Sequence, residues 1–200
     1  MLKNVSLISL IPTCAVVAMS EIILASGSPR RREMLAEAGI DFTVIPSSAE
    51  ELHDVEMQLH LLCEENAKRK AEVIAKDHPD AVVIGADTLV YIDQTPLGKP
   101  KSEEEARETL AKLSGRTHQV CTGVCLARGE ELSSFHVITE VVFKSLSPEL
   151  IRDYMSKVNV MDKAGSYAVQ EHGDMIVTEV RGSYDNVVGL PMKELLERLA

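Results

Sequence analysis

Residues 22–35 encode a strand that turns directly into a helix, and the rest of the chain is organised around this unit. The apolar run over 22–24 predicts a buried strand, and the small residues after it permit close approach of the backbone. Ser28 is a suitable N-cap and Pro29 a first-turn proline, so we expect the helix to begin there. The first N–H groups of that helix have no intrahelical partner, and the helix dipole adds positive potential at the same place.

Three consecutive arginines bring further positive charge to this helix start. Arg30, Arg31 and Arg32 oppose the helix dipole, and basic residues are normally disfavoured there. A local conflict of this kind is more typical of a functional site than of an idle surface, and the simplest ligand for the cluster is a phosphate chain. The alternative is a solvated helix start with ordinary surface ion pairs, and the local residues alone do not decide between the two.

A carboxylate interrupts the apolar stretch over residues 81–90. The run 82–84 predicts a fully buried strand, and Asp87 follows it after two small residues. Because an unpaired buried carboxylate is unfavourable, Asp87 should face a cation, a metal or a polar cleft. The alternative is a hydrogen-bonded aspartate in a turn. A proline-flanked turn at 96–100 then presents Lys99.

The remaining segments alternate between helical and strand patterns. Residues 117–143 alternate as two strands around a turn at 128–130, which predicts a long hairpin. Strands and helices that alternate early, followed by this antiparallel hairpin, favour an α/β class of fold with a mixed sheet and flanking helices. We expect helices over residues 55–76, 102–113, 147–157 and from 191 onward, strands over 41–45, 164–170 and 175–181, and a loop at 182–186.

Charge and composition narrow the classes of function. A chain of 200 residues is long enough for one good-sized domain. Its net charge of -10 argues against adhesion to nucleic acid polymers or to an anionic membrane, because both require a basic face. An acidic chain with a local arginine cluster suggests instead a small anionic ligand bound with a divalent metal. The four cysteines form no C-x-x-C pair, so we expect them to pack as thiols in a reducing cytoplasm.

The first 20 residues stand apart from the rest. Lys3 and the largely apolar run over 5–18 resemble a weak secretory signal, but the run is too short and too interrupted to span a membrane. We expect residues 1–20 to be a disordered or loosely packed extension from an upstream start, and residues 21–200 to form the functional domain. A cleaved or targeting segment is the minority alternative.

From Ile22 to its end, the chain resembles the Maf family, the septum-formation-associated nucleoside triphosphate pyrophosphatases. Six short matches in the family's order are far more specific than any one of them alone. The resemblance implies an elongated mixed sheet with two lobes around a cleft, related to inosine-triphosphatase-like folds. The matching motifs are A-S-G-S-P-R-R at 25–31, G-A-D-T at 85–88, G-K-P at 98–100, G-R-T-H-Q-V at 115–120, A-G-S-Y at 164–167 and V-G-L-P at 188–191.

The resemblance also implies hydrolysis of a nucleoside triphosphate to a monophosphate and pyrophosphate, with Mg²⁺ or Mn²⁺. Asp87 matches the family's proposed proton acceptor for the attacking water, and Asp87 and Glu51 could supply oxygen ligands to the metal. Glu50 is an alternative to Glu51, because this segment is less sharply patterned. The residues expected to bind or neutralise the triphosphate are Ser26, Arg30, Arg31, Lys70 and Lys99.

Three positions bear on the choice of base in this family. A branch resembling 7-methylguanosine triphosphate pyrophosphatases carries Trp, Gln and Glu there, whereas this chain has Arg30, Thr88 and Gln170. A neutral amide offers one donor side and one acceptor side, which complement the N3–H and carbonyl edge of uracil or thymine. The pattern therefore resembles the dTTP/UTP branch, and we expect dTTP and UTP diphosphatase activity in nucleotide-pool house-cleaning.

Other functions stay open at this point. A 7-methyl-GTP pyrophosphatase of the same family, a non-catalytic nucleotide-binding regulator of cell division and a phosphatase that releases orthophosphate are the alternatives. The presence of all the expected carboxylates and lysines disfavours a regulator without catalysis. The sequence leaves the oligomeric state open, a homodimer included.

Overall fold

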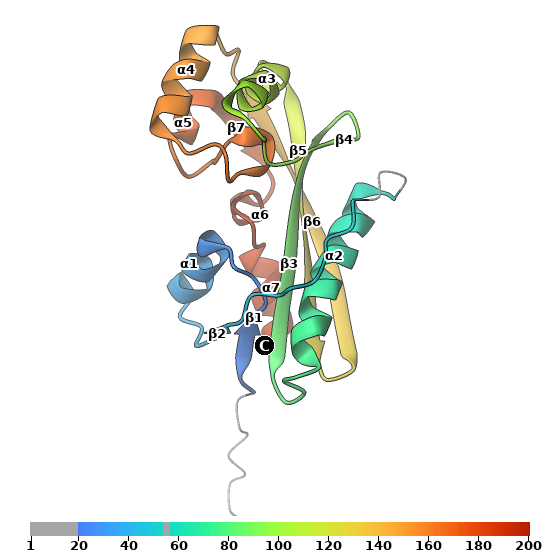
Figure 1. Ribbon diagram of the computed structural model, residues 1–200. Helices are drawn as coiled ribbons and strands as arrows, with labels where there is room; N and C mark the ends of the chain where they lie inside the picture. Colours follow the sequence, from blue (N-terminus) through green and yellow to red (C-terminus); the bar gives the residue numbers. More distant parts are fainter. Residues whose placement is uncertain (1–19, 54–56) are drawn as a thin grey trace, which may run out of the picture.

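The computed structural model describes residues 20–53 and 57–200 of the chain. In these residues seven strands form one sheet (Figure 1). The three strands β2, β1 and β3 are parallel and all other pairs are antiparallel, so the mixed sheet expected from the sequence is confirmed. The order is β2 (Thr43–Val44), β1 (Ile22–Leu24), β3 (Val82–Ile92), β5 (Thr117–Arg128), β6 (Glu131–Phe143) and β7 (Val177–Arg181), with β4 (Thr95–Leu97) paired to β3.

The helices cover the two faces of this sheet unequally. One face carries α2 (Leu59–Ala75), which packs on β3 and β5. The opposite face carries two separate apolar clusters, and these form the two lobes of the molecule (Figure 1). The lobe beside β1 contains α1 (Pro29–Glu37), α6 (Tyr184–Val188) and α7 (Met192–Leu199), and the other contains α3 (Glu103–Leu113), α4 (Pro148–Lys157), the 3-10 helix η1 (Ala164–Ser166) and α5 (Gly173–Ile176).

Helix α2 lies close to the sheet because two glycines face it. A Cβ atom on Gly85 of β3 would stand 2.1 Å from the carbonyl oxygen of Ala67, and one on Gly123 of β5 would stand 2.4 Å from the carbonyl carbon of Cys63. Neither contact is sterically allowed, so any larger residue would push the helix outward. The glycines therefore bring the polar side chains of α2 within reach of β3.

Local structure near the C-terminus differs from expectation in three places. The expected strand over 164–170 begins instead with η1, where Gly165 and Ser166 have positive φ angles that a strand does not accommodate. Of the strand expected over 175–181, only β7 forms, after α5 ends at Ile176. The expected loop at 182–186 holds the start of α6, which Ser183 caps. Helices of four or five residues are too short to show a helical period in the sequence.

Several terminal and boundary expectations fall partly outside the described residues. The extension expected over 1–20 lies outside the described residues except for Ser20. The expected start of the second helix at residue 55 also lies outside them, and in the structure this helix begins at Leu59. Cys63, Cys121 and Cys125 are buried free thiols, as the packing interpretation predicts. Within the described ranges, no helix is long and apolar enough to cross a membrane.

Candidate active site

One edge of β3 is open in the middle of the sheet. β1 pairs with residues 82–84 and β4 pairs with residues 90–92, so in the described part of the chain residues 85–89 are paired on the β5 side alone. Residues 87–90 of this edge line a cleft of about 1030 Å³ that also takes side chains from α1, α2 and the segment 162–171. Since successive strand residues point to opposite faces, both faces of the sheet can contribute to one site here.

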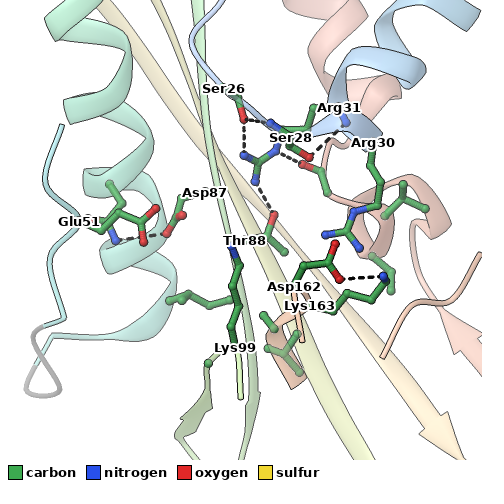
Figure 2. A pocket seen from close by; sticks show the side chains of 18 of the residues that line it. Ser26, Ser28, Arg30, Arg31, Glu51, Asp87, Thr88, Lys99, Asp162 and Lys163 are labelled. Carbon is green, nitrogen blue, oxygen red and sulfur yellow. Dashed lines mark hydrogen bonds and ion pairs between the residues drawn. The ribbon is translucent and has the colours of Figure 1, made fainter. Parts of the chain in front are cut away.

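Asp87 points toward α2 and is only 6% exposed. Its Oδ1 lies 2.8 Å from the Nζ of Lys70, and the same Nζ lies 2.7 Å from Oε1 of Glu51 (Figure 2). One ammonium group is thus held between two carboxylates. Lys70 provides the cation that burial of Asp87 requires.

Asn66 completes this side of the cleft, and sequence reasoning missed it. The Asn66 side chain is buried, and its Nδ2 donates to Oδ2 of Asp87 at 3.2 Å and to the carbonyl oxygen of Leu52. Its Oδ1 accepts from the Leu52 N–H at 2.7 Å. Asn66 therefore holds the segment that carries Glu51 against α2. Its position one helical turn before Lys70 is the signal that could have identified it.

Arg31 lies on the other side of β3, and each of its three side-chain nitrogens donates to a protein acceptor. Its Nε donates to the Gly189 carbonyl at 2.9 Å, and Nη1 donates to the Ala86 carbonyl and to Ser26 Oγ, both at 3.0 Å. Its Nη2 donates to Thr88 Oγ1 at 2.9 Å. Burial lowers the pKa of the guanidinium, and the charge of Asp87 opposes that shift. The arginine expected to bind phosphate thus also joins β1, β3 and the end of α6.

The other predicted ligand-binding residues surround the same cleft. Ser26 accepts from the Ser28 N–H and from Arg31, which leaves its own hydroxyl proton for another acceptor. Arg30 and Lys99 project into the cleft from α1 and from the turn after β4 (Figure 2). Gln170 lines it from the far lobe and is exposed to solvent. The structure therefore brings all nine predicted site residues to one cleft. Glu50, the alternative to Glu51, is absent from the described lining.

A buried lysine that sequence reasoning missed stands beside Gln170. Lys163 is 4% exposed, and its Nζ lies 3.0 Å from Asp162 Oδ1 and 3.2 Å from Glu171 Oε1. Burial alone would raise the pKa of Asp162, but the hydrogen bond from Lys163 and nearby charges, Arg30 among them, lower it. Figure 2 shows Asp162 near Arg30, which comes from the opposite lobe.

The residues of the cleft fit a divalent cation that has few protein ligands. One carboxylate oxygen of Asp87 and one of Glu51 approach the same point, where the Lys70 ammonium group now lies. Within residues 20–53 and 57–200, no group of three or more His, Cys, Asp or Glu side chains is arranged to hold a metal. Mg²⁺ commonly takes one or two carboxylates and completes its shell with water and substrate phosphates.

Comparisons with known proteins give matches over most of the chain. A family model described as "Maf-like protein" matches residues 21–200. A protein of Akkermansia muciniphila named "dTTP/UTP pyrophosphatase" is 53% identical over 178 residues, which cover 89% of this chain and 94% of that protein. A protein of Bacillus mycoides with the same name is 43% identical over 188 residues, which cover 90% of this chain and 95% of that protein.

Proposed function

The chain belongs to the Maf family, and on that premise we propose that it hydrolyses dTTP and UTP to the monophosphate and pyrophosphate. The observation that carries the proposal is the buried carboxylate of Asp87 at the open edge of β3, with cationic side chains on both sides of it. Such a site can hold a polyphosphate and accept a proton beside it.

The triphosphate would bind where hydroxyl and cationic groups converge. Ser26 has a hydroxyl proton to donate, and the N-terminus of α1 follows it in the chain after the N-cap Ser28. Arg30 and Lys99 project into the same space and can neutralise phosphate charge as it develops. The role of Arg31 is in part to fix this loop, because its hydrogen bonds run to protein acceptors.

Asp87 would accept a proton from the water that attacks the α-phosphorus. The water oxygen forms a bond to that phosphorus, the bond to the bridging oxygen breaks, and pyrophosphate leaves with the electron pair. Lys70 and Asn66 each hold one oxygen of the carboxylate and leave further lone pairs free for the proton. These two hydrogen bonds fix the orientation of the Asp87 carboxylate and leave a lone pair free to accept the proton.

Asp87 and Glu51 would also hold a divalent cation, Mg²⁺ or Mn²⁺, together with oxygen atoms of the substrate. When bound, such an ion neutralises phosphate charge and polarises the bond that breaks. Lys70 would then release Glu51 but keep its contact with Asp87, and its remaining N–H groups could bind phosphate oxygens.

Base selection would depend on Gln170, with Thr88 and Arg30 at the same cleft. The Gln170 amide can pair with the N3–H and a carbonyl of uracil or thymine, whereas cytosine presents a different order of donor and acceptor. A bound base would cover the exposed Gln170 amide, and a mismatched edge would then leave polar groups unpaired, which discriminates strongly between similar bases.

A nucleotide panel with a pyrophosphate readout tests the proposal. We expect kcat/KM to be highest for dTTP and UTP and lower for dCTP, GTP and 7-methyl-GTP, with loss of activity on chelation of the metal. The triple variant Arg30→Trp, Thr88→Gln, Gln170→Glu should shift preference toward 7-methyl-GTP. A wild-type preference for 7-methyl-GTP would overturn the base assignment. Orthophosphate as the product would favour a phosphatase, and binding without turnover would favour a regulator.

A further inference from the structure

A chain of hydrogen bonds leads from the cleft into the interior of the protein. Arg31 Nη2 donates to Thr88 Oγ1, and Thr88 Oγ1 lies 3.0 Å from Oγ1 of Thr122 on β5. The Thr122 hydroxyl donates to the carbonyl oxygen of Asn186 in α6, also at 3.0 Å. Thr122 and Asn186 are both completely buried, and neither is among the described residues that line the cleft.

The direction of this chain follows from the number of protons available. A hydroxyl group has one proton, and Thr122 gives its proton to Asn186. The proton between the two threonines must therefore come from Thr88. Because Thr88 donates its one proton to Thr122 and accepts from Arg31, it has no proton left for a ligand and faces the cleft as an acceptor only.

The far end of the chain is rigid. Oδ1 of Asn186 accepts from the Thr122 N–H, and its Nδ2 donates to the Val120 carbonyl and to Thr139 Oγ1. Each polar atom of this buried amide is satisfied by β5 or β6. A network that is complete in this way holds one arrangement, because any change leaves a buried group unpaired.

We propose that Thr122 is a positioning residue that fixes the Thr88 hydroxyl and the Arg31 guanidinium through this chain, with Asn186 as its anchor. Without Thr122 the Thr88 proton is released, and Thr88 no longer holds Arg31 Nη2 in one orientation. The consequence for base choice rests on the proposed function. A Thr88 hydroxyl that can only accept is compatible with uracil or thymine, which carry a proton at N3. A freed Thr88 hydroxyl could also donate to N3 of cytosine, which is an acceptor.

The chain offers a matched control on the neighbouring strand. Thr139 is as fully buried as Thr122 and also bonds Asn186, but its remaining contacts are with Ser183 and not with Thr88. Thr122→Val and Thr139→Val each remove a buried hydroxyl from the same asparagine. Only the first interrupts the path to Arg31, and Thr122→Ser restores the hydroxyl.

The test combines an NMR signature with kinetics. In full-length wild type and in Thr139→Val, we expect the Arg31 Nη2–H signal to exchange slowly with water. In Thr122→Val it should exchange at least about tenfold faster, and Thr122→Ser should restore slow exchange. With dTTP, Thr122→Val should lose at least about tenfold in kcat/KM, since small misplacements of positioning groups can cost about a hundredfold. Its preference for dTTP over dCTP should also fall.

Two results would overturn the inference. One is an Arg31 signal in Thr122→Val that exchanges as slowly as in wild type. The other is equal impairment of Thr122→Val and Thr139→Val at temperatures where circular dichroism shows both to be folded. Failure of the proposed function gives a different result, because wild type would then release no pyrophosphate from dTTP. The NMR comparison of the variants would still test whether Thr122 positions Arg31.

Discussion

At the scale of single residues, one backbone oxygen marks where the two halves of the site meet. The carbonyl oxygen of Ala86, on the open edge of β3, accepts from Arg31 at 3.0 Å and from Lys70 at 3.5 Å. The two cations come from opposite faces of the sheet. Asp87 and Thr88, the next two residues, then point to these two faces in turn. A buried carboxylate and a half-buried arginine thus meet at one strand edge from opposite faces of the sheet.

Asp87→Asn should abolish most of the turnover and leave the fold intact. Asparagine keeps the size of the side chain but cannot accept the proton, and loss of a general base typically costs about two to four orders of magnitude in rate. The measurement is kcat for dTTP at saturating metal, with thermal unfolding as the check on folding. Asp153→Asn, on the exposed side of α4, is the control and should keep wild-type activity. Wild-type turnover by Asp87→Asn would make this carboxylate structural.

Substitutions of Arg31 and Arg30 should differ in their effect on stability and agree in their effect on substrate use. Arg31→Ala should lower the free energy of unfolding by on the order of 3 kcal/mol, because hydrogen bonds of charged groups contribute about 1.5–3 kcal/mol each. Arg30→Ala should change it little, since Arg30 makes no side-chain hydrogen bond within the described residues. Both variants should lose kcat/KM for dTTP. Urea unfolding and steady-state kinetics measure the two effects, and equal stability of the variants would contradict this division.

At the scale of elements, the spacing between α2 and the sheet decides whether the site forms. Asn66 and Lys70 reach Asp87 because the helix rests directly on Gly85 and Gly123. The α2 helix and the β3–β5 pair therefore carry the catalytic side of the cleft as one unit. The open edge of β3 adds the other requirement, since a longer β1 would cover it.

Gly123→Ala should move α2 outward and lower both stability and activity. Overpacking of a close contact typically costs about 1–3 kcal/mol, and displacement of Lys70 from Asp87 should reduce kcat by more than the unfolded fraction explains. Denaturant unfolding and kinetics at a temperature well below the transition measure this. Gly173→Ala is the control, because its added Cβ would meet neighbours at an ordinary 3.7 Å. Unchanged activity in Gly123→Ala would show that the helix tolerates the shift.

Sequence patterns predicted the elements with strong local signals. The cap at Ser28, the buried strand before Asp87 and the long hairpin follow from neighbouring residues, and the structure contains them. The sequence did not reveal the contacts of Asn66 with Leu52 and Asp87, or the burial of Asn186 against β5. These depend on residues 14 to 64 positions apart, which local periodicity does not relate.

At the scale of the whole molecule, the motif around His118 joins the second lobe to the sheet. His118 Nε2 lies 2.7 Å from the Tyr167 hydroxyl, and Phe143 packs edge-on against both rings. The Nδ1 atom of His118 has no hydrogen-bond partner among the described residues. Burial lowers the pKa of His118 to about 4, so the ring is neutral near pH 7.

Stability should therefore fall with acidification between about pH 6.5 and about pH 4. The unfolded state takes up a proton on His118 as the pH drops below about 6.5, whereas the folded state does so only near 4. Between these values protonation favours unfolding, with a total effect of about 3 kcal/mol. His118→Gln should flatten this part of the profile of unfolding free energy against pH. An identical profile in wild type and variant would show that His118 is not protonated on unfolding.

The central claim is that this cleft cleaves dTTP and UTP between the α- and β-phosphates. The most direct measurement is ³¹P NMR of dTTP incubated with the full-length protein and Mg²⁺, beside Asp87→Asn and a sample with chelator. We predict growth of the dTMP and pyrophosphate signals in equal amounts with wild type alone. Accumulation of orthophosphate and dTDP, or equal turnover by Asp87→Asn, would contradict the account.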